Sequence, residues 1–134
     1  MAEIFKISQA SSLAFHSLLL IAQNSGSKLT TEKLAKKLGA SQAHLAKVLQ
    51  TLSRQGFIRA RRGPGGGYEL ARPCERISLL DIYQAIEGKF IPQKCLLEKK
   101  ICKGECIFGG FLERVNKELK DYFARTYLSE FVKK

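Results

Sequence analysis

The chain has 134 residues, of which 45% are hydrophobic, and its formal net charge is +11. This length suits one domain, or one domain with a dimerisation arm, and the apolar content suffices for a buried core. The sequence lacks both an apolar run long enough for a membrane-spanning helix and the pattern of a cleaved signal peptide. We therefore expect a cytoplasmic protein without a membrane partner. The excess of basic charge points to a polyanion such as nucleic acid.

Two helices are predicted in the first part of the chain. Residues 8–24 carry apolar side chains at helical spacing, and the Asn-Ser-Gly-Ser run that starts at residue 24 ends this helix. Thr30 or Thr31 can cap the next helix. Gly39 suits the left-handed backbone position just past its end.

A third helix is predicted from Ser41, as its N-cap, to about Gln55. Apolar side chains recur at helical spacing and predict one buried face: Leu45, Val48, Leu49 and Leu52. A helix in the major groove offers its N-terminal and solvent-facing side chains to base edges. On this basis we predict DNA contacts from Ser41, Gln42, Ala43, His44 and Lys47. Ser41 has an alternative role as a cap alone, and His44 as a phosphate contact or an exposed side chain.

The run from Arg62 to Tyr68, Arg-Gly-Pro-Gly-Gly-Gly-Tyr, lies between two strand-like pieces at residues 57–60 and 68–71. Glycine and proline at five successive positions exclude a helix and leave nothing to pack in a core, but they can form a thin hairpin tip. Helix, helix and basic hairpin is the order of a winged helix-turn-helix. We expect Arg59 to contact phosphate, and Arg61 and Arg62 to enter a narrow minor groove.

The placement of charge supports this interpretation. Residues 28–62 contain nine Lys or Arg and one acid, Glu32. The alternatives are a generic basic surface and a winged helix that binds RNA or protein without promoter specificity. We do not expect an enzyme or a small-molecule substrate, because the sequence has no Ser/His/acid constellation, no paired carboxylates and no phosphate-binding glycine motif that opens a helix.

The second half of the chain predicts two more helices. Ser78 with Asp81 can cap a helix that Gly88 ends. Residues 111–125 form a longer helix whose apolar stripe packs against a partner subunit, the protein's own first helix, or both. The expected fold is mostly α: a winged helix-turn-helix domain with a two-stranded wing (residues 1–88), a cysteine-containing sensor loop (89–110), and a long C-terminal dimerisation helix with its tail (111–134).

Three cysteines lie within twelve residues of this loop, Cys95, Cys102 and Cys106, whereas Cys74 stands apart and is expected to be structural. In a cytoplasmic chain such a cluster favours metal binding or redox chemistry over a disulfide framework. Three thiolates suit an iron–sulfur cluster, Zn or Cu(I) rather than hard ions. A structural Zn site and bare redox-active thiols remain alternatives to the iron–sulfur cluster, which we favour.

Residues 10–88 resemble the family of winged-helix regulators that includes IscR, NsrR and CymR, chiefly in the glycine-rich wing. The cysteine loop followed by a long helix resembles its cluster-binding members. The resemblance implies a homodimer with crossed long helices, bound to a palindromic promoter site in double-stranded DNA. It also implies that the loop cysteines hold an iron–sulfur cluster whose state alters DNA affinity. We favour a [2Fe–2S] over a [4Fe–4S] cluster. By the same resemblance Arg62 contacts the minor groove, and the recognition-helix contacts are Ser41, Ala43, His44 and Lys47.

The chain departs from this family pattern at the cluster ligands. Its cysteines have six and three intervening residues, where familiar members are more evenly spaced. Relatives take a fourth ligand from a carboxylate in the first helix or from a histidine soon after the third cysteine, and these positions hold Ser12 and Gly109 here. The candidates are His16, Ser12 and Glu3, another residue of the partner subunit, or an exogenous thiol or water. For His16, which has apolar neighbours in sequence, a satisfied core histidine is favoured over a ligand.

The expected function is therefore that of a homodimeric, sequence-specific transcriptional regulator. Its promoter affinity would respond to redox state, nitric oxide or iron–sulfur status through the cluster. The alternative is the same DNA-binding regulator without a cluster, controlled by thiol oxidation, Zn or a protein partner.

Overall fold

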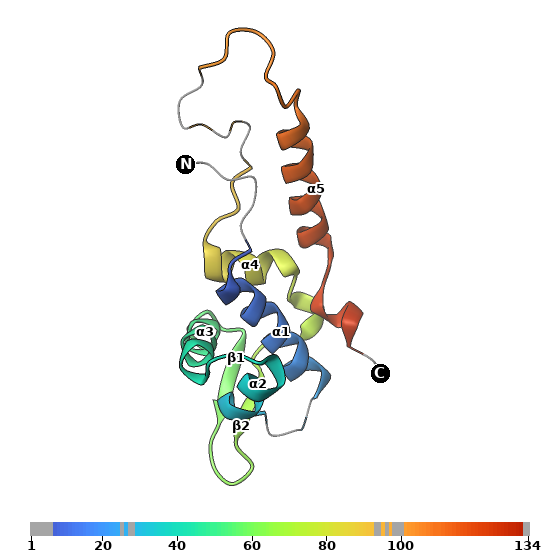
Figure 1. The fold of residues 1–134 in the computed structure, drawn as a ribbon. Helices are drawn as coiled ribbons and strands as arrows, with labels where there is room; N and C mark the ends of the chain where they lie inside the picture. The colour runs from blue at the N-terminus through green and yellow to red at the C-terminus, as the bar shows by residue number, and fades with distance from the viewer. Residues whose placement is uncertain are drawn as a thin grey trace.

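The computed structural model describes residues 7–24, 26, 29–92, 95, 97 and 101–132. Glu3, one of the candidate metal ligands, lies outside these residues. The fold is mostly helical, with one two-stranded antiparallel sheet (Figure 1). In chain order the elements are α1 (Gln9–Gln23), α2 (Thr31–Leu38), α3 (Gln42–Arg54), β1 (Ile58–Arg61), β2 (Gly67–Leu70), η1 (Cys74–Arg76), α4 (Leu79–Glu87), α5 (Phe111–Arg125) and η2 (Leu128–Phe131). In the described part of the chain, no helix combines the length and apolar character needed to cross a bilayer.

Local capping explains where the helices begin and end. Thr30 Oγ1 accepts a hydrogen bond from Lys33 N at the start of α2, and Gly39 ends that helix with φ of +63°. Ser78 and Asp81 form a reciprocal capping box at α4. The predicted helices are therefore confirmed, with Thr30 rather than Thr31 as the cap of α2.

The core lies around α1, which Figure 1 shows in the middle of the helices α1 to α4. These four helices are called the helical head below. Leu18 of α1, Leu34 of α2 and Leu49 of α3 are all fully buried in one cluster. Burial of a leucine side chain contributes about 1.5–3 kcal/mol, so this cluster fixes α3 relative to the other helices. The same cluster includes Ile58 at the start of β1, which joins the hairpin to the helical head.

The hairpin forms as expected, one residue out of step with the predicted strands. Ile58 pairs with Leu70 and Arg61 with Gly67, so β1 ends one residue later, and β2 begins and ends one residue earlier, than the hydrophobic pattern indicated. Tyr68 N donates to Leu29 O at 3.0 Å. This bond attaches the far strand to the segment that enters α2, so the wing is anchored on both sides.

The segment after α5 returns to the helical head. Leu79 N donates to Thr126 O at 2.9 Å, and Leu128 N donates to Ile77 O at 2.8 Å. Near the end of α5, the ring of Phe123 lies 5.7 Å from that of Phe15 in α1. The long helix therefore packs in part on the protein's own first helix, which was one of the two expectations for its apolar stripe.

Candidate nucleic-acid interface

Helix α3 has one buried and one exposed face. Leu45, Leu49 and Leu52 are fully buried, and Val48 is 4% exposed. The predicted contact residues lie at the start of α3 and are accessible: His44 is partly exposed, and the others are exposed, namely Ser41, Gln42, Ala43 and Lys47. The structure therefore leaves all five predicted recognition-helix residues accessible within the first two turns of α3. Whether they contact DNA remains a prediction.

The first turn of α3 is fixed by its cap and by the short turn before it. Ser41 Oγ accepts a hydrogen bond from His44 N at 3.2 Å, so Ser41 does serve as the N-cap. Ala40 N donates to Ala35 O at 2.9 Å, which closes the turn after α2. The remaining N–H groups and the helix dipole make this end of α3 attractive to an anion such as phosphate.

The wing requires glycine at two positions for steric reasons. A Cβ atom on Gly66 would lie 2.6 Å from Arg61 O, and one on Gly67 would lie 2.9 Å from Leu29 N. Gly66 N donates to Gly63 O at 2.8 Å, which forms the turn at the tip. The glycine run thus allows close backbone approach, both within the hairpin and against the segment before α2.

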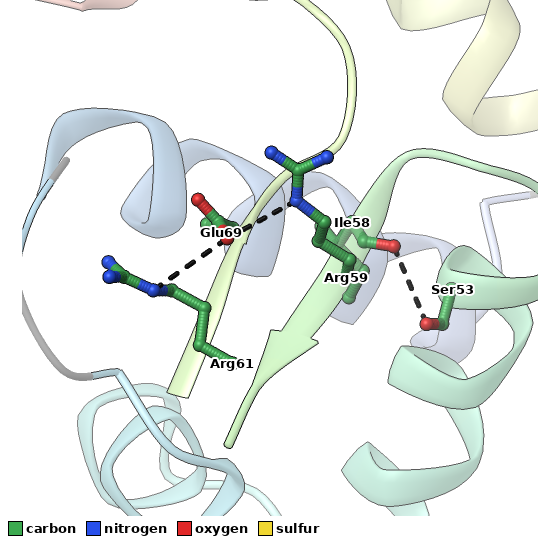
Figure 2. Close-up of polar contacts among 5 residues, drawn as sticks. All are labelled: Ser53, Ile58, Arg59, Arg61 and Glu69. Atoms are coloured by element: carbon green, nitrogen blue, oxygen red, sulfur yellow. Dashed lines mark hydrogen bonds and ion pairs between the residues drawn. The ribbon is translucent and has the colours of Figure 1, made fainter. Parts of the chain in front are cut away.

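The three predicted wing arginines differ in their surroundings. Arg62 is exposed and forms no ion pair with any described residue. Arg59 and Arg61 are both paired with Glu69 (Figure 2). Glu69 is not among the residues predicted from the sequence. Its position opposite Arg59 is the signal that identifies it, and this position follows only once the hairpin register is known.

Helix α3, the predicted DNA-reading helix, is also linked directly to the wing. Ser53 Oγ, in the last turn of α3, donates to Ile58 O at the start of β1 at 3.4 Å (Figure 2). Phe57 N donates to Leu52 O at 3.0 Å. These bonds hold the C-terminal end of α3 against the start of β1, so the two predicted DNA-contacting elements are fixed relative to each other.

The loop cysteines have suitable chemistry, but they are not gathered. Among the described residues, no three side chains of His, Cys, Asp or Glu lie close enough to hold a metal ion. Cys95 and Cys106 are partly buried, and Cys102 is exposed. Backbone N–H groups point at two of the sulfurs: Leu97 N donates to Cys95 Sγ at 3.4 Å and Phe108 N to Cys106 Sγ at 3.5 Å. In proteins that hold iron–sulfur clusters, hydrogen bonds to the ligating sulfurs tune the reduction potential.

His16 is not the core histidine that its apolar neighbours suggested. It is exposed, because it faces outward from α1, and its Nδ1 donates to Ser12 O at 2.7 Å. A proton on Nδ1 leaves the lone pair of Nε2 free, which is the usual arrangement of a metal-binding histidine.

Ser12 and His16 line an apolar groove of about 370 Å³, together with Phe123 near the C-terminal end of α5. Cys106 precedes the opposite end of that helix. The helical rise places the two ends about 18 Å apart, so Ser12 and His16 do not lie beside Cys106 of their own chain.

Three comparisons with known proteins agree with this architecture. Residues 7–134 match the model of the Rrf2 family, described as "Iron-dependent Transcriptional regulator". The chain is 41% identical over 70 residues to the HTH-type transcriptional regulator IscR of Cereibacter sphaeroides. The matched segment covers 52% of this chain and 45% of that protein.

Two solved structures share the fold. CymR (YrzC), the global cysteine regulator of B. subtilis, has a TM-score of 0.78 at 21% identity, covering 94% of this chain and 95% of that one. IscR of T. potens has a TM-score of 0.73 at 23% identity, covering 94% of this chain and 85% of that one. These likenesses confirm the winged-helix fold predicted from the sequence. With the family match over nearly its whole length, the chain belongs to the Rrf2 family of transcriptional regulators.

Proposed function

We propose that this regulator binds a palindromic promoter site as a homodimer and that the cysteine loop controls its affinity. The observation that carries the DNA-binding part is the division of α3 into a buried leucine face and an exposed polar face. Gln42 and Lys47 on the exposed face suit adenine and guanine edges, and Ala43 suits a thymine methyl group. Arg62 of the wing is free to enter the adjacent minor groove.

Selection of duplexes from a random-sequence pool tests this proposal without a known operator. The expected result is an enriched site with two inverted half-sites one helical turn apart, because two copies of α3 would read successive major grooves. A pool that stays unenriched, with binding that depends only on salt, would instead support a winged helix without promoter specificity.

A second copy of the chain suits the apolar groove between α1 and the end of α5. Phe131 and Ile7 line this groove and are exposed in the single chain, as are Phe111 and Tyr122 of α5. Burial of these side chains against a partner's α5 would remove apolar surface from water. Light scattering after gel filtration should give twice the chain mass. Phe131→Asp should shift the protein towards the monomer, whereas Lys117→Ala, at an exposed position on α5, should not.

The controlling group that we favour is an iron–sulfur cluster held by Cys95, Cys102 and Cys106. Soft thiolates and the N–H groups directed at two of them fit this group. Metal sites seldom exist before the metal binds, so the loop is expected to close around the cluster. When bound, the cluster would supply a centre sensitive to oxidants and nitric oxide. The partner subunit's His16 or Ser12 is the candidate fourth ligand, since the groove that holds these residues is where a second copy would dock.

Protein purified without oxygen decides between cluster and non-cluster control. The expected result is visible absorption with iron and acid-labile sulfide, lost on single replacement of a loop cysteine by Ala and retained in Cys74→Ala. His16→Ala should alter the spectrum if it supplies the fourth ligand. Colourless protein with Zn, or with no metal after reconstitution, would favour control by Zn, thiol oxidation or a protein partner, with the DNA-binding function unaffected.

The packing of α5 gives the loop a physical connection to the DNA-reading helix. The loop leads directly into α5, Phe123 near the other end of α5 packs on Phe15 of α1, and α1 shares its core with α3. A change in loop structure that moved α5 would therefore act on the helix that supports α3. In the dimer the same movement would change the spacing of the two reading helices, to which half-site recognition is sensitive.

A further inference from the structure

One carboxylate of the wing engages two arginines. Arg59 Nε lies 3.2 Å from Glu69 Oε1, and Arg61 Nε lies 3.7 Å from the same oxygen. The hairpin register explains this arrangement, because Glu69 is directly opposite Arg59, and Arg61 follows two residues later on the same strand. All three side chains therefore leave the same face of the hairpin. Figure 2 shows the two guanidinium groups converging on Glu69 through their Nε atoms.

The choice of nitrogen matters for what the arginines can still bind. A guanidinium has five N–H donors, and a contact through Nε leaves the edge formed by its two terminal nitrogens unused. That edge matches phosphate in a bidentate manner. In Figure 2 the terminal nitrogens of Arg59 and Arg61 point away from Glu69. Glu69 and two phosphates could thus hold the arginines at the same time.

We propose that Glu69 is a positioning residue of the wing, which aims the terminal edges of Arg59 and Arg61 at DNA phosphates and so raises the preference for a specific site over random duplex. For Arg61 this replaces the minor-groove contact expected from the sequence, and Arg62 keeps that role. The inference rests on the proposed DNA-binding function. Without the carboxylate, two like charges on one face of the hairpin repel each other and their side chains sample many orientations. When the carboxylate holds both arginines, less side-chain entropy is lost on DNA binding.

Two opposing effects of the carboxylate separate specific from non-specific binding. Its negative charge repels the phosphates of any duplex, which weakens all binding. Its fixed hold on Arg59 and Arg61 helps only where those arginines occupy defined positions, as they do at a specific site. Random duplex therefore experiences the repulsion, while the specific site also benefits from the orientation.

A role limited to holding the hairpin together does not fit the surroundings. The side chain of Glu69 is 38% exposed, and those of Arg59 and Arg61 are 64% and 57% exposed. Ion pairs with this exposure are screened by solvent and contribute little to stability. The hairpin is held instead by its backbone pairing, by Tyr68 N on Leu29 O and by the buried Ile58.

The test compares wild-type protein with Glu69→Gln, which removes the charge and keeps the shape of the side chain. The probes are the best duplex selected by the wild-type protein and a scrambled duplex of the same length and composition. Glu75→Gln is the matched control, because it makes the same charge change at an exposed position in η1. Dissociation constants are measured over a range of salt concentrations, and thermal unfolding is followed in parallel.

Glu69→Gln should weaken binding to the selected duplex about two- to fivefold. It should strengthen binding to the scrambled duplex by about twofold, with a steeper salt dependence. Opposite changes of this kind need a residue that acts on orientation as well as on charge. Tighter binding to both duplexes in equal measure, as expected of Glu75→Gln, would reduce Glu69 to a repulsive charge. Parallel weakening with a lower melting temperature would reduce it to a structural residue, and no change on either duplex would also overturn the proposal.

The same Glu69→Gln change in a protein that lacks both arginines shows whether Glu69 acts through them. In Arg59→Gln/Arg61→Gln protein, the further change Glu69→Gln should no longer weaken binding to the selected duplex, since neighbouring residues that work together are not additive. An undiminished effect there would contradict the proposal. Failure of the wild-type protein to select any duplex would instead contradict the proposed DNA-binding function, so the two failures are distinguishable.

Discussion

The guanidinium carbon of Arg72 lies 4.1 Å from the centre of the Phe57 ring. The same side chain donates from Nη2 to Gln55 O at 2.9 Å and from Nε to Gly56 O at 3.3 Å. Arg72 therefore binds the carbonyl groups just beyond the C-terminal end of α3, where a positive charge is favourable, and covers the first aromatic ring after it. A residue that follows the wing thus fixes the junction between reading helix and wing.

Replacing Arg72 by Ala should lower the free energy of unfolding by about 1–2 kcal/mol, from the lost stacking and the lost hydrogen bonds. Denaturant titration measures this loss. Arg72→Lys keeps the charge but not the planar fork, so an intermediate loss is expected. If Arg72→Ala matched the wild type in stability, the contacts of Arg72 would have no structural role.

Gly67→Ala should distort the wing without unfolding the helical head. Its φ of +152° and the approach of Leu29, at 2.9 Å from an added Cβ, leave no room for a side chain. Substitution by Ala at a positive φ costs at least about 1 kcal/mol, and here the backbone of Leu29 must also move. We expect weaker binding to the selected duplex with far-UV circular dichroism close to wild type. Ala60→Ser, at an exposed position on β1, is the control and should bind normally.

The sequence predicts those features of the fold that depend on near neighbours. The i, i+3, i+4 spacing of Leu45, Val48 and Leu49 predicts one buried face on α3, and a serine or threonine cap depends only on the next three residues. The strands were predicted one residue out of step, because the tight turn at Gly66 sets the register of the hairpin and the hydrophobic pattern does not.

Features that depend on distant pairing were not predictable in this way. The contact of Glu69 with two arginines can be predicted only when the hairpin register is known. The hydrogen bond from Leu128 to Ile77 depends on the tertiary fold. The stacking of Arg72 on Phe57 depends on the two ends of the hairpin lying side by side.

For His16 the local pattern predicts the wrong surroundings. Leu13, Leu19 and Leu20, three and four positions away on the helix, are apolar, yet His16 is exposed. Its exposure depends on which elements cover that side of α1, and this is decided by the tertiary fold.

The two faces of α3 should respond to mutation in opposite ways. Leu49→Ala should destabilise the fold by about 2–5 kcal/mol, because it leaves a cavity at a fully buried position. Lys47→Ala, on the exposed face, should change stability by less than about 0.5 kcal/mol while weakening DNA binding. A phosphate contact by Lys47 would also lower the salt slope by about 1. Denaturation and salt-dependent binding of both variants check this, and a Lys47→Ala variant that bound normally would remove Lys47 from the interface.

Gln42 offers a sharper test of base reading than Lys47, because an uncharged side chain contributes little to non-specific attraction. Gln42→Ala should weaken binding to the selected duplex by about 1–3 kcal/mol if the amide pairs with adenine. Binding to the scrambled duplex should be unchanged. Gln50→Ala, exposed later on the same helix, is the matched control. Equal loss on both duplexes would show that Gln42 contacts the backbone and not a base.

The Cys74 thiol should react slowly with alkylating reagents at neutral pH. Burial is the first cause that raises its pKa above the ordinary 9.0, followed by the hydrogen bond to Glu75 and the charge of that carboxylate. Alkylation by iodoacetamide requires thiolate, so its rate at Cys74 should have a midpoint above pH 9.0. Glu75→Gln should lower the midpoint only in part, since burial remains. Peptide mass spectrometry across pH measures these rates, and exposed Cys102 serves as the internal comparison.

The same raised pKa has a consequence for stability, with a definite sign. The folded protein holds the Cys74 proton more tightly than the unfolded chain does, so the stabilisation is complete below the unfolded thiol's pKa. It is lost as pH rises through the higher folded value. The wild type should therefore lose stability above about pH 9 more steeply than Cys74→Ala, which has no thiol to ionise. Denaturant midpoints of the two proteins from pH 7 upward check this, and curves that stayed parallel throughout would contradict a shifted pKa at Cys74.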